Sequence, residues 1–303
     1  MTNRTGQQLG NYRILRLLGQ GGFARVYLGE HIHLGTQAAI KIQNSQVAPH
    51  DMAQFQQEAR TLAKFIHPNI VRVLDLGVDN SMPFLVMDYA PGGTLRQCHP
   101  KGSRLPLSTV VEYVEQIARA LQFAHDQGII HRDIKPENML LGRTNELLLS
   151  DFGIALILQT SQNQITKDTV GTITYMAPEQ LNGHPRPASD QYALGIVAYE
   201  WLSGNPPFDG PPAEIFIQHQ KTRPPSLRGQ LPTLSPNVEW VIMKALAKKP
   251  EDRFDSVNTF AMELKQASVE RPVPTELEPV GSEKLTPSWR QGRQSQKRSL
   301  SRR

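Results

Sequence analysis

The chain has 303 residues, of which 39% are hydrophobic and 20% are charged, a composition that supports a sizeable apolar core. Its one cysteine, Cys98, excludes a disulfide within the chain and fits a reducing compartment. The longest apolar stretch, residues 193–202, contains Glu200 and is too short to span a bilayer. Residues 1–10 are polar and lack the apolar segment of a signal peptide. We therefore expect a soluble, cytoplasmic protein.

The net charge of +5 arises entirely after residue 270. Residues 1–270 carry 25 basic and 25 acidic side chains, whereas residues 271–303 carry 8 basic and 3 acidic ones. We expect residues 269–303 to form a disordered basic tail, rich in proline and polar residues, with solvation as its ordinary role. A tether to an anionic membrane or an acidic partner is the alternative. Specific nucleic-acid binding is not expected, because the excess charge lies outside the folded part.

The first third of the chain has the composition of β-strands. We expect one strand to begin at Tyr12 and others to cover residues 26–28 and 38–42. The glycine-rich segment 19–25 joins the first two. A glycine turn between two strands, rather than between a strand and a helix, argues against a dinucleotide-binding fold. It is compatible with an ordinary hairpin or with a flap over phosphate groups.

The next segments contain a lysine and a glutamate, Lys41 and Glu58, whose charges are opposite. Lys41 ends the third expected strand and, taken alone, is an ordinary edge lysine. Residues 51–65 carry apolar side chains at helical spacing, and Glu58 falls on the apolar face. A buried carboxylate is costly unless it is paired, so Glu58 needs a basic partner.

After a strand over residues 84–87 and a glycine-containing linker at 88–93, the pattern becomes helical. Apolar residues recur at helical spacing between Val110 and Leu121, with Ser108 as the expected cap. A second helix, capped by Ser189-Asp190, is apolar almost all round through Leu202 and should be buried. These elements predict an α+β fold.

The densest group of chemically active side chains lies at residues 131–138 (HRDIKPEN), followed by Asp-Phe-Gly at residues 151–153. Each residue alone could belong to a surface ion pair or a loop. Short apolar runs at 138–141 and 147–150 predict two strands, so Asp151 lies at a strand end. Carboxylates that converge at strand ends need a cation to offset their repulsion. Hard oxygen ligands of this kind suit Mg²⁺.

In combination these segments resemble the protein kinases, close to the bacterial serine/threonine type. Residues 131–138 match the catalytic-loop motif and residues 151–153 the metal-binding motif. Residues 38–41 (AAIK) and 177–179 (APE) match two further motifs of the family. The resemblance implies a bilobal fold with a β-rich N-lobe at about residues 11–87, a hinge at 88–93 and a mainly helical C-lobe at 94–268. Residues 1–10 would be an N-terminal extension.

The resemblance implies separate roles for the polar side chains. Asp133 would accept the proton of a substrate hydroxyl, and Lys135 would offset charge on the transferred phosphoryl group. Lys41 would pair with Glu58 and contact ATP phosphates. The metal ligands, for Mg²⁺ or alternatively Mn²⁺, would be Asn138 and Asp151. The expected nucleotide-binding residues are Leu18, Gly19, Gly21, Gly22, Phe23, Ala24, Val26, Ala39, Lys41, Met87, Asp88, Ala90 and Leu140. Among them, Ala24 replaces the third glycine of the family pattern.

Regulation is expected in the threonine-rich segment between the Asp-Phe-Gly and Ala-Pro-Glu motifs. Arg132 would bind a phosphothreonine at Thr166 or Thr169, with Thr166 favoured. Thr172 would instead contact Asp133 and Lys135.

Two structural contacts are also implied by the resemblance. Glu179 would pair with Arg253, and Asp190 would bind the backbone of the catalytic loop.

These features predict a serine/threonine protein kinase that transfers the γ-phosphoryl group of ATP to protein substrates, with homodimerisation left open. The first alternative is a pseudokinase, which binds nucleotide as a scaffold. The others are a nucleic-acid-binding or membrane-binding protein that acts through its tail, and a small-molecule kinase of similar fold.

Overall fold

The computed structural model describes residues 4–22, 24–44, 49–152 and 173–269. In the first helix the description covers the backbone but not every side chain. The undescribed side chains there are Pro49, His50, Asp51, Gln54 and Glu58. The expected tail beyond Val269 lies outside the described residues.

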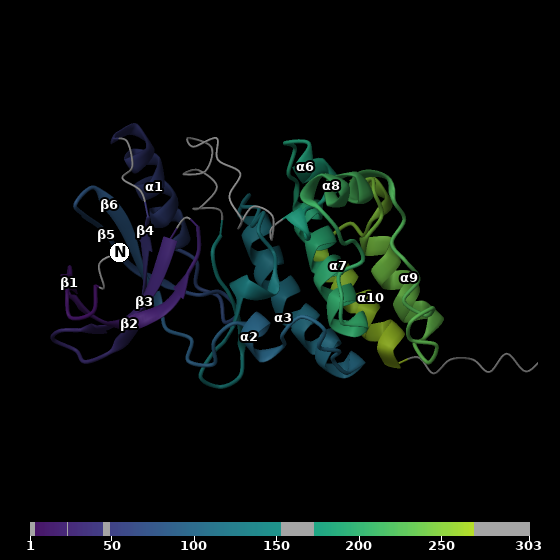
Figure 1. Ribbon diagram of the computed structural model, residues 1–303, viewed down its shortest axis with the longest axis horizontal. Coiled ribbons are helices and arrows are strands. Elements are labelled where there is room, and N and C mark those ends of the chain that lie inside the picture. Colours follow the sequence, from purple (N-terminus) through teal and green to yellow (C-terminus); the bar gives the residue numbers. More distant parts are fainter. Residues whose placement is uncertain (1–3, 23, 45–48, 153–172, 270–303) are drawn as a thin grey trace, which may run out of the picture. The chain divides into compact units, whose positions relative to one another are not determined.

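Six strands form one antiparallel sheet in the order β1-β2-β3-β4-β6-β5 (Figure 1). Their bounds are β1 Gln8–Leu9, β2 Tyr12–Gln20, β3 Ala24–His31, β4 Gln37–Gln43, β5 Val73–Asp79 and β6 Met82–Asp88. The strands predicted at the start of the chain and at residues 84–87 are confirmed. Strand β1 was not predicted, and it joins part of the expected N-terminal extension to the sheet.

The strand register separates the sheet into two faces, because residues directly opposite in an antiparallel pair point to the same side. Val26 is opposite Lys41, and Ala39 is opposite Met87, so all four share one face. The other face carries a separate apolar cluster. Its buried members are Leu9, Tyr12, Ile14, Tyr27, Ala38, Ile40, Ile42, Phe84 and Val86.

Helix α1, Pro49–Leu62, packs beside β5. Its apolar stripe places Phe55, Ala59 and Leu62 in the main core. The helix ends at Leu62 rather than continuing to Phe65 as the spacing suggested. Phe65 is nevertheless buried, with its ring edge-on to the rings of Phe123 and Phe152.

The rest of the chain is mainly helical. Helix α3 packs against α7 and α10, and α9 packs against both of these (Figure 1). The helix bounds are α2 Leu95–Cys98, α3 Leu107–Asp126, α6 Pro178–Leu181, α7 Pro187–Ser203, α8 Pro212–Lys221, α9 Pro236–Ala245 and α10 Val257–Val269. Short 3₁₀ turns occur at η1 Pro136–Asn138 and η2 Pro250–Asp252. Among these described helices, none is long and apolar enough to cross a membrane.

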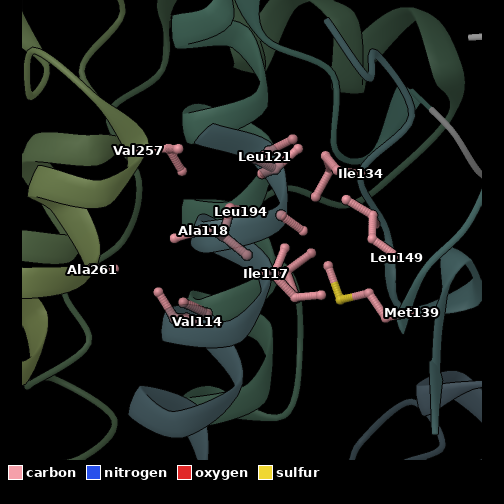
Figure 2. Close-up of a cluster of buried hydrophobic side chains, with 14 of the residues drawn as sticks. Val114, Ile117, Ala118, Leu121, Ile134, Met139, Leu149, Leu194, Val257 and Ala261 are labelled. Carbon is pink, nitrogen blue, oxygen red and sulfur yellow. The ribbon is translucent and has the colours of Figure 1, made fainter. Parts of the chain in front are cut away.

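A hairpin of β7 Met139–Leu141 and β8 Leu147–Leu149 confirms the two short strands predicted around the acidic motifs. Figure 2 shows Ile117 and Leu121 of α3 facing Ile134, Met139 and Leu149 of the loop and hairpin. The same helix meets α7 and α10 on its other sides. The central core therefore lies directly under the segment that carries the polar motif.

The predicted cap of α3 was wrong, and in α7 Ser189 takes part in the cap without being the N-cap residue. Helix α3 has Pro106 at its N-cap, so Ser108 lies inside the helix. Helix α7 begins at Pro187, because proline's fixed φ favours the first helical position. Ser189 is therefore the third residue of the helix, where its hydroxyl accepts the N–H of the N-cap residue Arg186. The prediction that α7 is buried almost all round is confirmed, with every residue from Ser189 to Ser203 buried.

Candidate active site

The polar motif forms a loop between α3 and β7, and the apolar side chain of Ile134 holds it to the core. Ile134 is only 1% exposed and packs under the loop, whereas its neighbours Asp133 and Lys135 keep 24% and 18% of their side chains exposed (Figure 2). This alternation of a buried apolar residue with exposed charged neighbours fixes the loop by apolar packing. It leaves the charged groups on either side accessible.

Asp190 in α7 holds the start of this loop. Its carboxylate accepts the backbone N–H groups of His131 at 2.9 Å and Arg132 at 2.8 Å, and Nε2 of His125 at 2.7 Å. Arg132 has φ of 68°, a left-handed conformation that is strained for a residue with a side chain. The contact between Asp190 and the loop backbone predicted from the sequence is confirmed.

His131 is a neutral structural group. It is fully buried, its Nε2 donates to the carbonyl of Ser150 at 2.8 Å, and its Nδ1 accepts the N–H of Asp133 at 3.2 Å. These two bonds need one protonated and one bare ring nitrogen. Burial lowers the pKa of His131, which keeps this neutral form. The ring thus ties the backbone of Asp133 to the end of β8.

The three expected catalytic-loop side chains meet. Oδ2 of Asp133 is 2.9 Å from the ammonium nitrogen of Lys135 and accepts Nδ2 of Asn138 at 2.9 Å. The same Nδ2 also donates to the carbonyl of Asp133 at 2.8 Å. Oδ1 of Asp133 is buried and accepts no hydrogen bond from the described residues. Asp133 is therefore held by one oxygen and presents the other as an unused acceptor.

Lys41 and Asp151 meet across 110 positions of sequence, at 2.6 Å between Nζ and Oδ1. Asp151 has φ of 66°, a strained conformation directly after β8. Burial alone would raise the pKa of the Asp151 carboxyl, but the Lys41 ammonium outweighs it, so the pKa lies below its usual value. The predicted pairing of Lys41 with Glu58 cannot be placed, since the side chain of Glu58 is outside the described residues.

The described residues expected to bind a nucleotide lie in the N-lobe sheet, in its glycine turn, just after β6 and in β7. Lys41 and Met87 line a cavity that also reaches Asp151. Leu18, Gly19 and Ala24 belong to the hairpin of β2 and β3, and Gly21 and Gly22 form its turn. Asp88 ends β6, Ala90 follows it, and Leu140 of β7 bridges to Thr94. Phe23 lies outside the described residues.

Of the predicted regulatory residues, only Arg132 is described. Its carbonyl accepts Nε2 of Gln180 at 2.6 Å, while its own Nε is buried and has no hydrogen-bond partner in the described part of the chain. Thr166, Thr169 and Thr172 lie outside the described residues.

The predicted pair of Glu179 and Arg253 is confirmed. Their closest N–O distance is 2.7 Å, and the guanidinium also donates to three backbone carbonyls. Burial would raise the pKa of Glu179, but Arg253 outweighs it and the pKa lies below its usual value. This pair joins α6 to the segment before α10.

Sequence reasoning missed a network below the catalytic loop. Arg96 of α2 donates to Glu137 of the loop at 2.9 Å and to Glu200 of α7 at 2.7 Å, and the hydroxyl of Tyr175 donates to Glu200 at 2.7 Å. Burial opposes the charge of Arg96, but the bond to Glu200 together with the nearby Tyr175 and Glu137 outweighs it and raises the pKa of the guanidinium. The available signal was Glu200 itself, a charge in an apolar helix that needs a partner.

Comparison with known proteins gives a family match over most of the chain. The model of the protein kinase domain matches residues 12–267. The serine/threonine-protein kinase PrkC of Bacillus subtilis is 37% identical over 262 residues, which cover 85% of this chain and 40% of the relative. Pkn1 of Myxococcus xanthus is 38% identical over 274 residues, or 88% of this chain and 39% of the relative. PknA of Mycobacterium tuberculosis is 37% identical over 293 residues, or 93% of this chain and 67% of the relative. The chain therefore spans about 40% of the length of PrkC and Pkn1.

Proposed function

The chain belongs to the protein kinase family, and from this premise we propose that it transfers the γ-phosphoryl group of ATP to serine and threonine hydroxyls of proteins. The names of the similar bacterial proteins support the serine/threonine class. The geometry of the site supports the roles proposed below for individual residues.

The observation that carries the proposal is the unequal use of the two oxygens of Asp133. Oδ2 is fixed by Lys135 and Asn138, whereas Oδ1 is buried without a donor among the described residues. A buried acceptor without a donor is costly, so a site that keeps one is suited to a donor that arrives with the substrate. An incoming hydroxyl supplies such a donor. Asp133 would orient this hydroxyl for attack and receive its proton.

Lys135 and Lys41 supply positive charge at two places. Lys135, 2.9 Å from Asp133, would offset negative charge on the transferred phosphoryl group. Lys41, on the face shared with Val26 and Met87, would contact the remaining phosphates. Most of the rate enhancement would come from holding the hydroxyl and the phosphate chain in line.

Asn138 and Asp151 fit a divalent cation. Among the described residues no hydrogen bond reaches Oδ1 of Asn138, and Asp151 keeps one carboxylate oxygen outside its bond to Lys41. An amide and a carboxylate oxygen suit a hard cation such as Mg²⁺, with Mn²⁺ as the alternative. When bound, the cation would neutralise phosphate charge.

The nucleotide would lie between an N-lobe at about residues 11–87 and a C-lobe at 94–268, joined by a hinge at 88–93. Val26, Ala39 and Leu140 would cover the adenine ring. Met87 would limit the depth of its pocket, and the backbone at Asp88 and Ala90 would bind the adenine edge.

The unpaired Nε of Arg132 supports activation by phosphorylation. A half-buried guanidinium with a free donor is a site for a phosphothreonine, which binds it through charge-assisted hydrogen bonds. Thr166 is the favoured position and Thr169 the alternative. Mass mapping of active enzyme should find a phosphate on one of them, and active enzyme unmodified at both would refute this assignment.

The basic residues 271–303 would bind an anionic membrane or an acidic partner. Their removal should leave kinase activity unchanged and abolish binding to vesicles that contain anionic lipid. Equal vesicle binding by the truncated chain would exclude this role.

Radiolabelled ATP tests the main proposal. The chain should label itself and a general protein substrate on serine and threonine, with either Mg²⁺ or Mn²⁺. Asp133→Asn should remove the label, whereas Asp209→Asn, at an exposed site outside the loop, should retain it. No label in the wild type with either cation would favour the scaffold alternative. Label on tyrosine alone would refute the substrate class.

A further inference from the structure

A small hollow lies on the N-lobe sheet, next to the glycine turn, on the sheet face opposite Lys41. Tyr27 and Ile42, on the sheet face opposite Lys41, form part of its wall. The lining residues are Arg4, Arg25, Tyr27, Ile42, Gln43, Asn44 and Met82. Two of these described lining residues are arginines, and none is acidic.

Arg25 lacks the partner that a half-buried guanidinium needs. Its Nε is buried without a hydrogen bond, and the described residues provide it with no carboxylate. Arg25 lies on β3 directly after the glycine turn and opposite Ile42. A charge that loses solvent without gaining an anion is costly, so the site favours an anion from outside.

Arg4 adds a second guanidinium to the hollow. One amino group donates to Asp79 at 2.8 Å, and the other has only the sulfur of Met82, at 3.9 Å. Sulfur is a weak acceptor, so this second group keeps most of its capacity to bind an anion. The side chain is 15% exposed, which positions the guanidinium rather than leaving it to move in solvent.

We propose that this hollow binds a phosphate-type dianion, either free inorganic phosphate or the phosphoryl group of a phosphopeptide. Two planar guanidiniums with unused donors match the several oxygens of a phosphate better than the two of a carboxylate. Asp79 neutralises one of the two cations, so a dianion still finds a net positive site.

The hollow also touches the glycine turn. Nδ2 of Asn44, a lining residue, donates to the carbonyls of Gly21 at 3.1 Å and Gly22 at 3.0 Å. An anion held by Arg25 and Arg4 would immobilise the start of β3 and the hydrogen bonds from Asn44 to the glycine turn. A stiffer turn should lower the KM for ATP. This consequence rests on the proposed kinase activity, whereas binding of the anion does not depend on that activity.

Methyl NMR of the full chain with ¹³C-labelled methionine tests the binding directly. Met82 lines the hollow and Met87 lines the cavity behind the expected nucleotide site, so the two methyls report separately. Phosphate added at constant ionic strength should shift Met82 with saturation and leave Met87 in place. Arg25→Gln should weaken the apparent affinity at least tenfold, and Arg4→Gln should weaken it independently. Arg13→Gln, which removes an exposed charge from β2, should have no effect.

The source of the anion is resolved by a parallel titration with N-acetyl-phosphoserine methylamide. Tighter binding of this compound identifies a phosphopeptide, and tighter binding of phosphate identifies the free ion. A Met82 shift that does not saturate, that is equal in Arg25→Gln, or that is replaced by a Met87 shift refutes the site. If the site binds but the KM for ATP is the same with and without the anion, the link to the glycine turn is refuted. A chain without kinase activity would still give the NMR result.

Discussion

Asp190→Asn should damage both stability and catalysis while removing only one oxygen and one charge. The wild-type carboxylate accepts three donors, from the backbone of His131, the backbone of Arg132 and the ring of His125. An asparagine side chain has one oxygen, and its NH₂ group would face at least one of these N–H donors. Hydrogen bonds to a charged acceptor contribute about 1.5–3 kcal/mol each. With one bond lost and the others weakened, the free energy of unfolding should fall by about 2–4 kcal/mol.

The same change should act on catalysis through Arg132. Its left-handed backbone, with φ of 68°, carries strain of about 1–3 kcal/mol that the Asp190 bonds offset. Once they are weakened, the loop should relax and move Asp133, and a shift of about 1 Å can cost about 100-fold in rate. Urea unfolding and steady-state kinetics measure the two effects, with Asp209→Asn as the exposed control. A folded Asp190→Asn protein with wild-type kcat would refute the anchoring role.

Three further changes test the packing around the site. Burial lowers the pKa of His219 to about 4, so the unfolded chain takes up a proton first as pH falls from 6.5. The free energy of unfolding should therefore drop between pH 6.5 and 4, by at most about 3 kcal/mol. In His219→Gln the urea midpoint should change less with pH over this range than in the wild type. An equal dependence of the midpoint on pH in both proteins would contradict this. Arg253→Met should cost about 3–5 kcal/mol at pH 7 by stranding the buried carboxylate of Glu179. Because Arg253 holds the pKa of Glu179 below its ordinary 4.5, the pair stabilises above that pH and is lost on acidification, so the wild type and variant should converge at low pH. Gly92→Ala should lower Tm by several degrees, because a Cβ would lie 2.8 Å from the carbonyl oxygen of Leu141, and an unchanged Tm would show that the hinge yields at no cost.

The strands and the polar loop could be predicted because their signals are local. A β-strand composition predicted the strands between Tyr12 and Ile42, and the resemblance of residues 131–138 to the catalytic-loop motif implied roles for Asp133, Lys135 and Asn138, which the structure brings together. Helix starts were less predictable. A serine can cap a helix only if the chain turns there, and proline residues shifted the start of α3 and of α7.

Contacts between residues far apart in the sequence could not be predicted unless one of them was a charge without a local partner. The bond between Lys41 and Asp151 spans 110 positions and that between Arg96 and Glu200 spans 104. Nothing near Arg4 or Arg25 in the sequence indicates that they line one hollow, because that depends on how β1 adds to the sheet. Backbone strain at Arg132 and Asp151 is equally invisible, since neither residue type requires a positive φ.

The site divides its residues into those that fix the loop and those that remain reactive. His131 and Ile134 are almost fully buried and bind the core, whereas the side chains of Asp133 and Lys135 keep about a fifth of their surface exposed. A carboxylate alone in solvent would move among rotamers and hold a hydroxyl poorly. One buried deeply would bind a proton and lose its charge. Attachment through backbone N–H groups, an apolar anchor and a single carboxylate oxygen avoids both outcomes. It leaves one oxygen of Asp133 oriented but unused, as the proposed transfer to a hydroxyl would require.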